Sequence, residues 1–332
     1  MEKNVQKLIE ILGKERVGIH EPLWKYSSLH IGGPADLFFR AKEQKDLIQG
    51  VNAARKLSIP FFILGGGTNI LIGDKGFRGL VIKNETNLIK FVRIYGGKKQ
   101  SEGGNTAKVH TVYLEVETGV GVNRLVRFTI EQGLAGLEVF LGQPGSVGGA
   151  VYINAHNMRL GKFIGDAIYG AKLLNKAGSI VEVPHTYFKF GYDRSSIQES
   201  EDIVLSVLFK LEVGNKDQLW QKAQSVLEYR RQTQPQGVFS AGCTFRNISK
   251  SDAVRIATPD YTQSAGFLLD SLGLKGEKRG NACFSSEHAN FITHKGQAKA
   301  CDMLELINLA KKNVKDKYGI ILQEEIVQVG DF

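Results

Sequence analysis

Consecutive glycines beside small polar residues are the first feature of this sequence that could do chemistry. One such loop consists of Gly65, Gly66, Gly67, Thr68 and Asn69. Consecutive glycines can adopt positive φ angles and let the backbone approach a ligand closely. Their N–H groups can form a concave site for an anion such as a pyrophosphate. Taken alone, a triple glycine is more often a simple tight turn, and the spacing fits neither GxGxxG nor a Walker A loop.

A second loop, at 142–150, strengthens the interpretation as a cofactor site. It holds four glycines and one proline in nine residues. The residues predicted to contact a cofactor are Gly142, Pro144, Gly145, Ser146, Gly148, Gly149 and Ala150. Rigid proline beside flexible glycine suits backbone contact with an anion or a flat ring. With a third glycine element at Ile31–Asp36, three unlike loops favour a large cofactor over coincidence.

The spacing of apolar residues predicts the elements that position these loops. Helices are expected at 43–58, 123–132, 216–231, 264–272 and 297–317. Strands are expected at 61–64, 80–82, 113–117, 171–174, 180–183, 203–211 and 320–322, the last ending in Glu324–Val327. The glycine- and lysine-rich stretch 95–108 is expected to be an exposed loop. Strands and helices without strict alternation indicate an α+β fold.

The 332 residues are too many for one small core and predict several domains. The predicted divisions are 1–83, 84–213 and 214–318, with the C-terminal strand at 319–332 completing the first. No apolar run approaches the ~18 residues that span a bilayer, and the N-terminus lacks the apolar core of a secretory signal. We therefore expect a cytosolic protein that does not bind membranes.

Charge and cysteine content exclude further classes. The net charge of +9 is spread thinly, and no basic run or nucleic-acid motif accompanies it, so nucleic-acid binding is not expected. The three cysteines show no CxxC spacing and do not resemble a disulfide framework. No cluster of His, Cys and Asp predicts a metal site.

Taken together, the loops resemble the UDP-N-acetylenolpyruvoylglucosamine reductase family of bacterial peptidoglycan synthesis, in its shorter type. The matching stretches follow the family order over nearly the whole chain: HIGGPADLF (30–38), ILGGGTNILI (63–72), GLEVFLGQPGSVGGAVYINA (136–155), SAGCTFRN (240–247), SAGFLLDSLGLKG (264–276), SSEHANFI (285–292) and GIILQEEIVQVG (319–330). One such motif would be weak evidence, but seven in order are specific.

The resemblance implies a fold and a reaction. The fold would be a vanillyl-alcohol-oxidase-like (PCMH-type) FAD-binding unit of two subdomains, followed by an α+β substrate-binding domain. NADPH would reduce non-covalently bound FAD, and the reduced flavin would convert UDP-N-acetylenolpyruvoylglucosamine to UDP-N-acetylmuramate. The expected protein is a monomer that binds a UDP-sugar and NADPH.

The resemblance also implies three catalytic residues. Cys243 falls where the family has its proton donor, which is usually serine, and a thiol with a pKa near ~8.5 is the stronger acid. Glu325 matches the family carboxylate, and Arg194 is the candidate cation for the enolate. On residue type alone, Cys243 would be a small buried thiol, Glu325 a solvated carboxylate and Arg194 a surface residue paired with Asp193.

Two stretches depart from the family pattern. The family places arginine directly after the tyrosine of its FGY segment, but here Asp193 stands between Tyr192 and Arg194. After Asn154-Ala155 the family continues with small glycine-rich residues, whereas this chain reads His156-Asn157-Met158-Arg159. That stretch is expected to lie near the flavin.

Two weaker candidates would bind the substrate. Asn247 follows Cys243 by four residues, as in the family's uridine-sugar site, and Arg231 lies where a basic residue could meet the diphosphate. Either could be an exposed helix-end residue. The nearest alternative function is another FAD oxidase or dehydrogenase of the same superfamily, acting on an alcohol or a hydroxy acid. Such a protein should lack SAGCTFRN and the terminal Glu325.

Overall fold

The computed structural model describes residues 2–100 and 106–332. The chain forms two compact units, each with its own core. Unit 1 comprises Met1–Val17, Phe39–Gly66 and Ile82–Arg230, and unit 2 comprises Gly18–Phe38, Gly67–Val81 and Arg231–Phe332. The predicted divisions at 83, 213 and 318 stay a prediction. In the described part of the chain, no helix is long and apolar enough to cross a bilayer.

The first part of unit 1 pairs two helices, α1 (Glu2–Leu12) and α2 (Gln44–Lys56). The predicted helix at 43–58 is confirmed as α2, and Leu47, Val51 and Ala54 on its predicted apolar face are buried. It begins where it does because Asp46 accepts a hydrogen bond from the Glu43 N–H, which satisfies a backbone donor at the helix start. The strand β3 (Phe61–Leu64) then leads into the first glycine loop.

A four-stranded sheet has the order β1-β2-β5-β3, with β1 at Val17–Pro22, β2 at Pro34–Ala41 and β5 at Phe77–Asn84. The chain passes from one unit to the other inside β1, inside β2 and inside β5. The predicted strand at 80–82 is part of β5.

The larger sheet of unit 1 has the strand order β12-β11-β13-β7-β6, and β8 (Leu134–Ala135) pairs with β13. Its strands are β6 (Ile89–Gln100), β7 (Thr106–Glu117), β11 (Ile168–Leu174), β12 (Ile180–Pro184) and β13 (Ile203–Val213). Apolar side chains of β7 and β13 share one core with α3 (Val122–Glu131). The strands predicted at 113–117, 171–174, 180–183 and 203–211 and the helix at 123–132 are confirmed.

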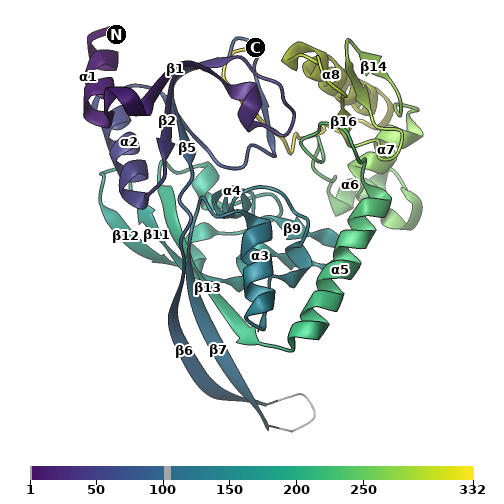
Figure 1. Cartoon of the computed structure of the whole chain (residues 1–332). Helices are drawn as coiled ribbons and strands as arrows, with labels where there is room; N and C mark the ends of the chain where they lie inside the picture. Colours follow the sequence, from purple (N-terminus) through teal and green to yellow (C-terminus); the bar gives the residue numbers. More distant parts are fainter. Residues whose placement is uncertain (1, 101–105) are drawn as a thin grey trace. The chain divides into compact units, whose positions relative to one another are not determined.

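The expected loop at 95–108 is wrong at both of its ends. Tyr95 to Gln100 continue β6, and Thr106 to Lys108 begin β7, so the two strands form a long hairpin that extends beyond the rest of its sheet (Figure 1). Residues 101–105 lie outside the described residues. Glycine and lysine disfavour strands only weakly, and here the pairing with the neighbouring strand overrides that preference.

Unit 2 gathers three helices, α6 (Lys250–Arg255), α7 (Ala265–Ser271) and α8 (Ala300–Tyr318), around one apolar core. Three short strands, β14 (Lys278–Arg279), β15 (Ala282–Phe284) and β16 (Ile292–Thr293), pair beside them. The predicted cap of α7 is confirmed, because Ser264 Oγ accepts a hydrogen bond from the Phe267 N–H at 3.2 Å. Helix α8 begins at Ala300 and not at Gln297, which has a φ of 60°.

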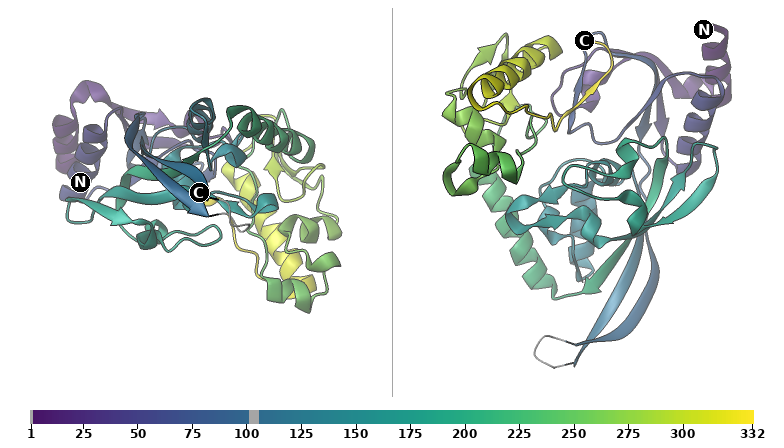
Figure 2. Two further views of the ribbon diagram at one scale, coloured as in Figure 1. Left: turned by 90° about the horizontal axis from the view of Figure 1, so that it is seen from below. Right: turned by 180° about the vertical axis from the view of Figure 1, so that it is seen from behind.

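The C-terminal strand differs from the prediction. Residues 320–322 form no strand, and the pairing segment is β17 (Val327–Val329), which lies parallel to β4 (Ile70–Ile72) (Figure 2). Ile320 and Leu322 instead bury their side chains in the core beside α8. Glu324 pairs with Phe245 through a single bridge, so Glu325 lies in a bend before the strand.

Candidate active site

The two predicted cofactor loops meet inside unit 1. A Cβ built on Gly65 would lie 2.3 Å from Ser146 Oγ, and one on Gly66 would lie 2.5 Å from Gly145 Cα. Only glycine allows backbones to approach this closely. Ser146 caps α4 (Val147–Tyr152) by accepting a hydrogen bond from the Gly149 N–H at 3.3 Å. The geometry therefore explains why both loops are rich in glycine.

The rest of the second loop is fixed by contacts within unit 1. Gly142 has a φ of +83° and donates its N–H to Asn123 Oδ1 at 2.7 Å. A Cβ on Gly148 would lie 3.0 Å from Thr118 Cβ, so this glycine allows α4 to approach the end of β7. Pro144 and Gly149 are exposed, whereas Ala150 is buried.

The first loop continues into unit 2 at Gly67. Its φ of +66° and a distance of 1.9 Å from a built Cβ to Tyr26 O exclude any side chain there. Thr68 follows, and the Asn69 side chain donates a hydrogen bond to the backbone oxygen of Glu325 at 3.0 Å. The Val327 N–H donates in turn to Asn69 O at 3.0 Å. Asn69 therefore ties the loop to the C-terminal segment.

Lys83 is a half-buried cation that the sequence analysis did not single out. Its ammonium group donates a hydrogen bond to the Gly65 carbonyl oxygen. Burial lowers the pKa of Lys83, because the surrounding protein solvates the charge poorly. The only sequence signal was a lysine at the end of an apolar strand, which is common on protein surfaces. A bound phosphate would stabilise this charge, so the side chain fits a pyrophosphate-binding role.

Cys243 lies in unit 2 in a half-buried position. Gly242 before it has a φ of +83°, and Cys243 itself forms a bridge with Phe291. The next residue, Thr244, donates its N–H to Asn290 O at 2.7 Å and accepts a bond from the Glu325 N–H at 2.9 Å. Unit 2 therefore brings the segments of two predicted catalytic residues, Cys243 and Glu325, side by side.

Neighbouring Glu324 has a different environment. Its carboxylate forms an ion pair with Lys311 of α8 and accepts a hydrogen bond from Gln328 Nε2 at 2.8 Å. Both carboxylate oxygens of Glu324 are therefore engaged in contacts within unit 2. This supports the choice of Glu325 as the carboxylate of the site.

The other predicted residues occupy varied positions. Arg194 is exposed, and its guanidinium lies 2.8 Å from Glu199, not from Asp193 as residue type alone suggested. Asn247 Oδ1 accepts a hydrogen bond from the Ala265 N–H at the start of α7, at 3.3 Å. Arg231 is exposed near the end of α5 (Lys216–Thr233). The roles of all three stay predictions.

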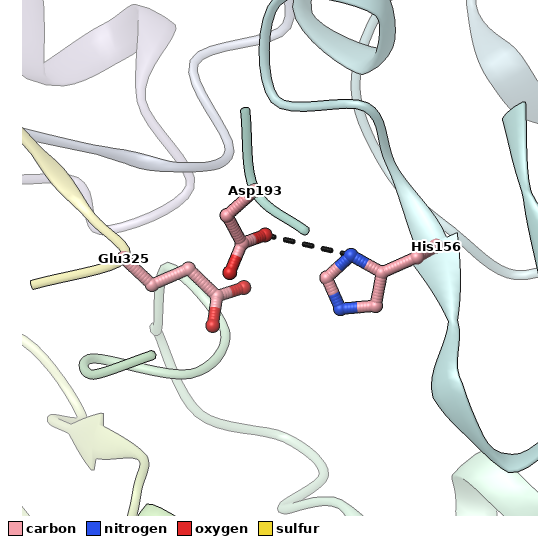
Figure 3. Close-up of side chains that lie close together, drawn as sticks. All are labelled: His156, Asp193 and Glu325. Carbon is pink, nitrogen blue, oxygen red and sulfur yellow. Dashed lines mark ion pairs between the residues drawn. The ribbon is translucent and has the colours of Figure 1, made fainter. Parts of the chain in front are cut away.

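The stretch that begins at His156 contacts Asp193 in unit 1, so the two stretches that the sequence analysis singled out meet. His156 Nδ1 lies 3.4 Å from Asp193 Oδ1, and the two side chains are 14% and 1% exposed (Figure 3). Burial lowers the pKa of His156, and the charge of Asp193 opposes that effect. The sequence showed each change separately, but it could not show that they meet. Glu325, also drawn in Figure 3, belongs to unit 2.

Comparison with known proteins first defines the class. Residues 35–184 match the family described as "FAD binding domain", and residues 234–329 match "UDP-N-acetylenolpyruvoylglucosamine reductase, C-terminal domain". The chain is thus a flavoprotein of the PCMH type with an appended C-terminal domain, which confirms the predicted fold class.

Full-length relatives then define the family. The chain is 33% identical to the UDP-N-acetylenolpyruvoylglucosamine reductase of Caldanaerobacter subterraneus subsp. tengcongensis over 98% of both chains. It is 34% identical to that of Anoxybacillus flavithermus, over 98% of this chain and 99% of the relative. The crystal structure of the Thermus caldophilus reductase matches with a TM-score of 0.71 and 28% identity, over 94% of this chain and 98% of the other. The chain belongs to the UDP-N-acetylenolpyruvoylglucosamine reductase family.

Proposed function

We propose that this protein, as a cytosolic monomer, uses NADPH and non-covalent FAD to reduce UDP-N-acetylenolpyruvoylglucosamine to UDP-N-acetylmuramate for peptidoglycan synthesis. The observation that supports the proposal is the backbone hydrogen bond from Glu325 to Thr244, which joins the segment of the predicted carboxylate to the segment of the predicted proton donor Cys243. Full-length similarity to reductases of this family supports it.

The glycine loops and Lys83 would hold the FAD pyrophosphate. Gly65 and Gly66 offer bare backbone, and the Lys83 ammonium lies at the Gly65 carbonyl oxygen. Reduced flavin, when bound, supplies the hydride for the alkene. Asn247 and Arg231 are proposed to bind the UDP-sugar.

Cys243 would complete the reduction. One alkene carbon gains a hydride, and the resulting enolate beside the substrate carboxylate must then gain a proton at the other carbon. The Cys243 thiol gives up that proton, and its thiolate is reprotonated from water. Cysteine would thus replace the usual serine of the family. Arg194 is the first candidate for the positive charge that stabilises the enolate, which would require its exposed ion pair with Glu199 to open.

The decisive experiment mixes the purified protein with NADPH and then with the enolpyruvyl sugar. We expect a yellow protein that NADPH bleaches and the sugar restores, with the muramate product found by mass spectrometry. A protein that takes up no FAD, or a reduced flavin that the sugar cannot reoxidise, contradicts the proposal. Bleaching by an alcohol or a hydroxy acid instead of NADPH would indicate the alternative function.

A further inference from the structure

His156 and Asp193 form a buried pair that the proposed reaction has not yet used. The pair joins β9 (His156–Asn157) to the tight turn Gly191–Arg194, whose two ends bond each other through their backbones. Both residues stand in the two stretches that depart from the pattern that the resemblance implies. Because these two residues contact each other, we interpret them as one functional pair and not as two independent surface substitutions.

The surrounding backbone holds the two segments together. Asn154 Nδ2 donates a hydrogen bond to Gly191 O at 2.9 Å, and Ser195 Oγ donates to Tyr152 O at 2.6 Å. Asn154 and Asp193 both adopt left-handed φ angles, 50° and 49°, which these residue types tolerate better than most. The segment that follows α4 is therefore held against the turn Gly191–Arg194, and the Asp193 carboxylate is buried.

Stability alone gives little reason for such a pair. Burying a carboxylate and an imidazole removes both from water, and an apolar pair of similar volume is often at least as stable. Buried titratable groups with a specific charge partner are, by contrast, typical of functional sites. The aromatic rings of Phe163 and Tyr192 lie beside the imidazole, with ring centroids 5.8 Å and 4.9 Å away, and limit its movement.

We propose that His156 donates the hydrogen bond to the carboxylate or enolate oxygen of the substrate, and that Asp193 positions and charges it. The proposal rests on the proposed function. Asp193 Oδ1 lies 3.4 Å from Nδ1, and Nε2 is on the other side of the imidazole ring (Figure 3). Burial lowers the pKa of His156 in the free protein, and an anionic substrate oxygen at Nε2 would favour the protonated ring. An imidazolium has two N–H donors, one for Asp193 and one for that oxygen. The imidazolium would place a positive charge beside the substrate oxygen, and the Asp193 carboxylate would stabilise that charged form.

The test measures the two half-reactions of the FAD-loaded protein by rapid mixing. His156→Gln should slow flavin reoxidation by the enolpyruvyl sugar about 100-fold, the usual effect of losing one oxyanion donor. Asp193→Asn should slow it about tenfold, because the neutral amide has nearly the same shape but removes a favourable charge beside His156, equivalent to about one pKa unit. Flavin reduction by NADPH should stay near the wild-type rate in both variants. His185→Gln, at an exposed histidine of the same unit, is the matched control and should be as fast as the wild type.

A reversion separates chemistry from structure. The single variant His156→Gly should reoxidise its flavin with the sugar much more slowly than wild type. The double variant His156→Gly/Asp193→Arg, which restores the pattern that the resemblance implies, should reoxidise at least tenfold faster than the single variant. A tenfold change in rate corresponds to about one pKa unit of interaction. Three results would overturn the proposal. The first is that His156→Gln reoxidises its flavin at the wild-type rate. The second is that His156→Gln and Asp193→Asn are slowed equally or both lose the flavin, and the third is that the double variant is no faster than His156→Gly. If Arg194→Gln slows flavin reoxidation and His156→Gln does not, Arg194 and not His156 stabilises the enolate, and the proposal is wrong. A wild-type protein that cannot use the sugar at all would refute the proposed function instead.

Discussion

Gly66 and Gly145 belong to loops far apart in the sequence, yet a Cβ on Gly66 would lie only 2.5 Å from Gly145 Cα. The atom that a side chain would strike is backbone and cannot rotate away. The close approach of these two glycines makes the predicted cofactor loops a single structure within unit 1.

Gly66→Ala should therefore disturb this structure. We expect a loss of about 1–3 kcal/mol in the free energy of unfolding, as for other overpacked sites, together with weaker FAD binding. Urea unfolding and fluorescence titration with FAD measure the two effects. Gly121→Ala is the control, because its methyl would have Gly145 O at 3.9 Å as its nearest neighbour. Equal stability of the two variants would contradict the packing argument.

Gly149→Ala tests whether FAD contacts the backbone at this position, because the substitution should not destabilise the fold. Gly149 is exposed, and a Cβ there would lie 3.6 Å from its nearest neighbour, Ser146 Oγ, so the methyl fits. Alanine also favours the helix by up to about 1 kcal/mol. We expect unchanged or raised stability but an FAD dissociation constant about tenfold higher, equivalent to about 1.4 kcal/mol. Unchanged FAD affinity would show that the cofactor does not approach this backbone.

Asn69→Ala should act on Glu325 through the lost side-chain hydrogen bond to the Glu325 backbone. We expect a stability loss of about 1 kcal/mol and slower flavin reoxidation by the sugar, with flavin reduction less affected. Stopped-flow absorbance at the flavin band measures both steps. Asn281→Ala is a matched control, because that amide also donates to a backbone oxygen, of Gln297, at 3.1 Å but on an exposed surface.

Cys243→Ala should leave flavin reduction by NADPH intact and block turnover of the enolpyruvyl sugar. Cys243→Ser should retain part of the turnover, because a serine hydroxyl can also donate a proton, although it is a weaker acid than a thiol. Product formation and the two half-reactions are measured as above, with Cys283→Ala as the control at another half-buried thiol of unit 2. If Cys243→Ala supports both half-reactions equally well, the thiol is not the proton donor.

Lys222→Met should alter the acid stability of unit 1. Burial would raise the pKa of Glu138, but hydrogen bonds from Lys222 and from the Gly136 N–H outweigh this and lower the pKa. The contribution of the pair is therefore present above the ordinary glutamate pKa of about 4.3 and is lost as pH falls through the lower folded value.

The expected change for Lys222→Met is about 1 kcal/mol less stability at pH 7, since half of the Lys222 side chain is exposed, and a smaller difference from wild type near pH 3. Urea unfolding at the two pH values measures it. Lys216→Met breaks a more exposed pair with Glu131 and should change little. A difference that grows on acidification would contradict the assigned direction of the pKa shift.

Local patterns predicted much of this molecule. The helix α2, the Ser264 cap and the strands of the larger sheet follow from residue spacing, because their causes lie within a few neighbouring residues. The errors lie at 95–108 and 320–322. In the first, pairing with a neighbouring strand lengthened the strands, and in the second, burial against α8 replaced strand pairing.

By itself, the sequence determined the glycine loops, the family and the chemistry available at Cys243 and Glu325. Only the tertiary structure decided that Gly66 packs on Gly145, that Asn69 bonds Glu325, and that His156 meets Asp193. The physical reason is that contact between distant segments depends on how whole elements pack. The residues that will meet carry no local signal of their partner.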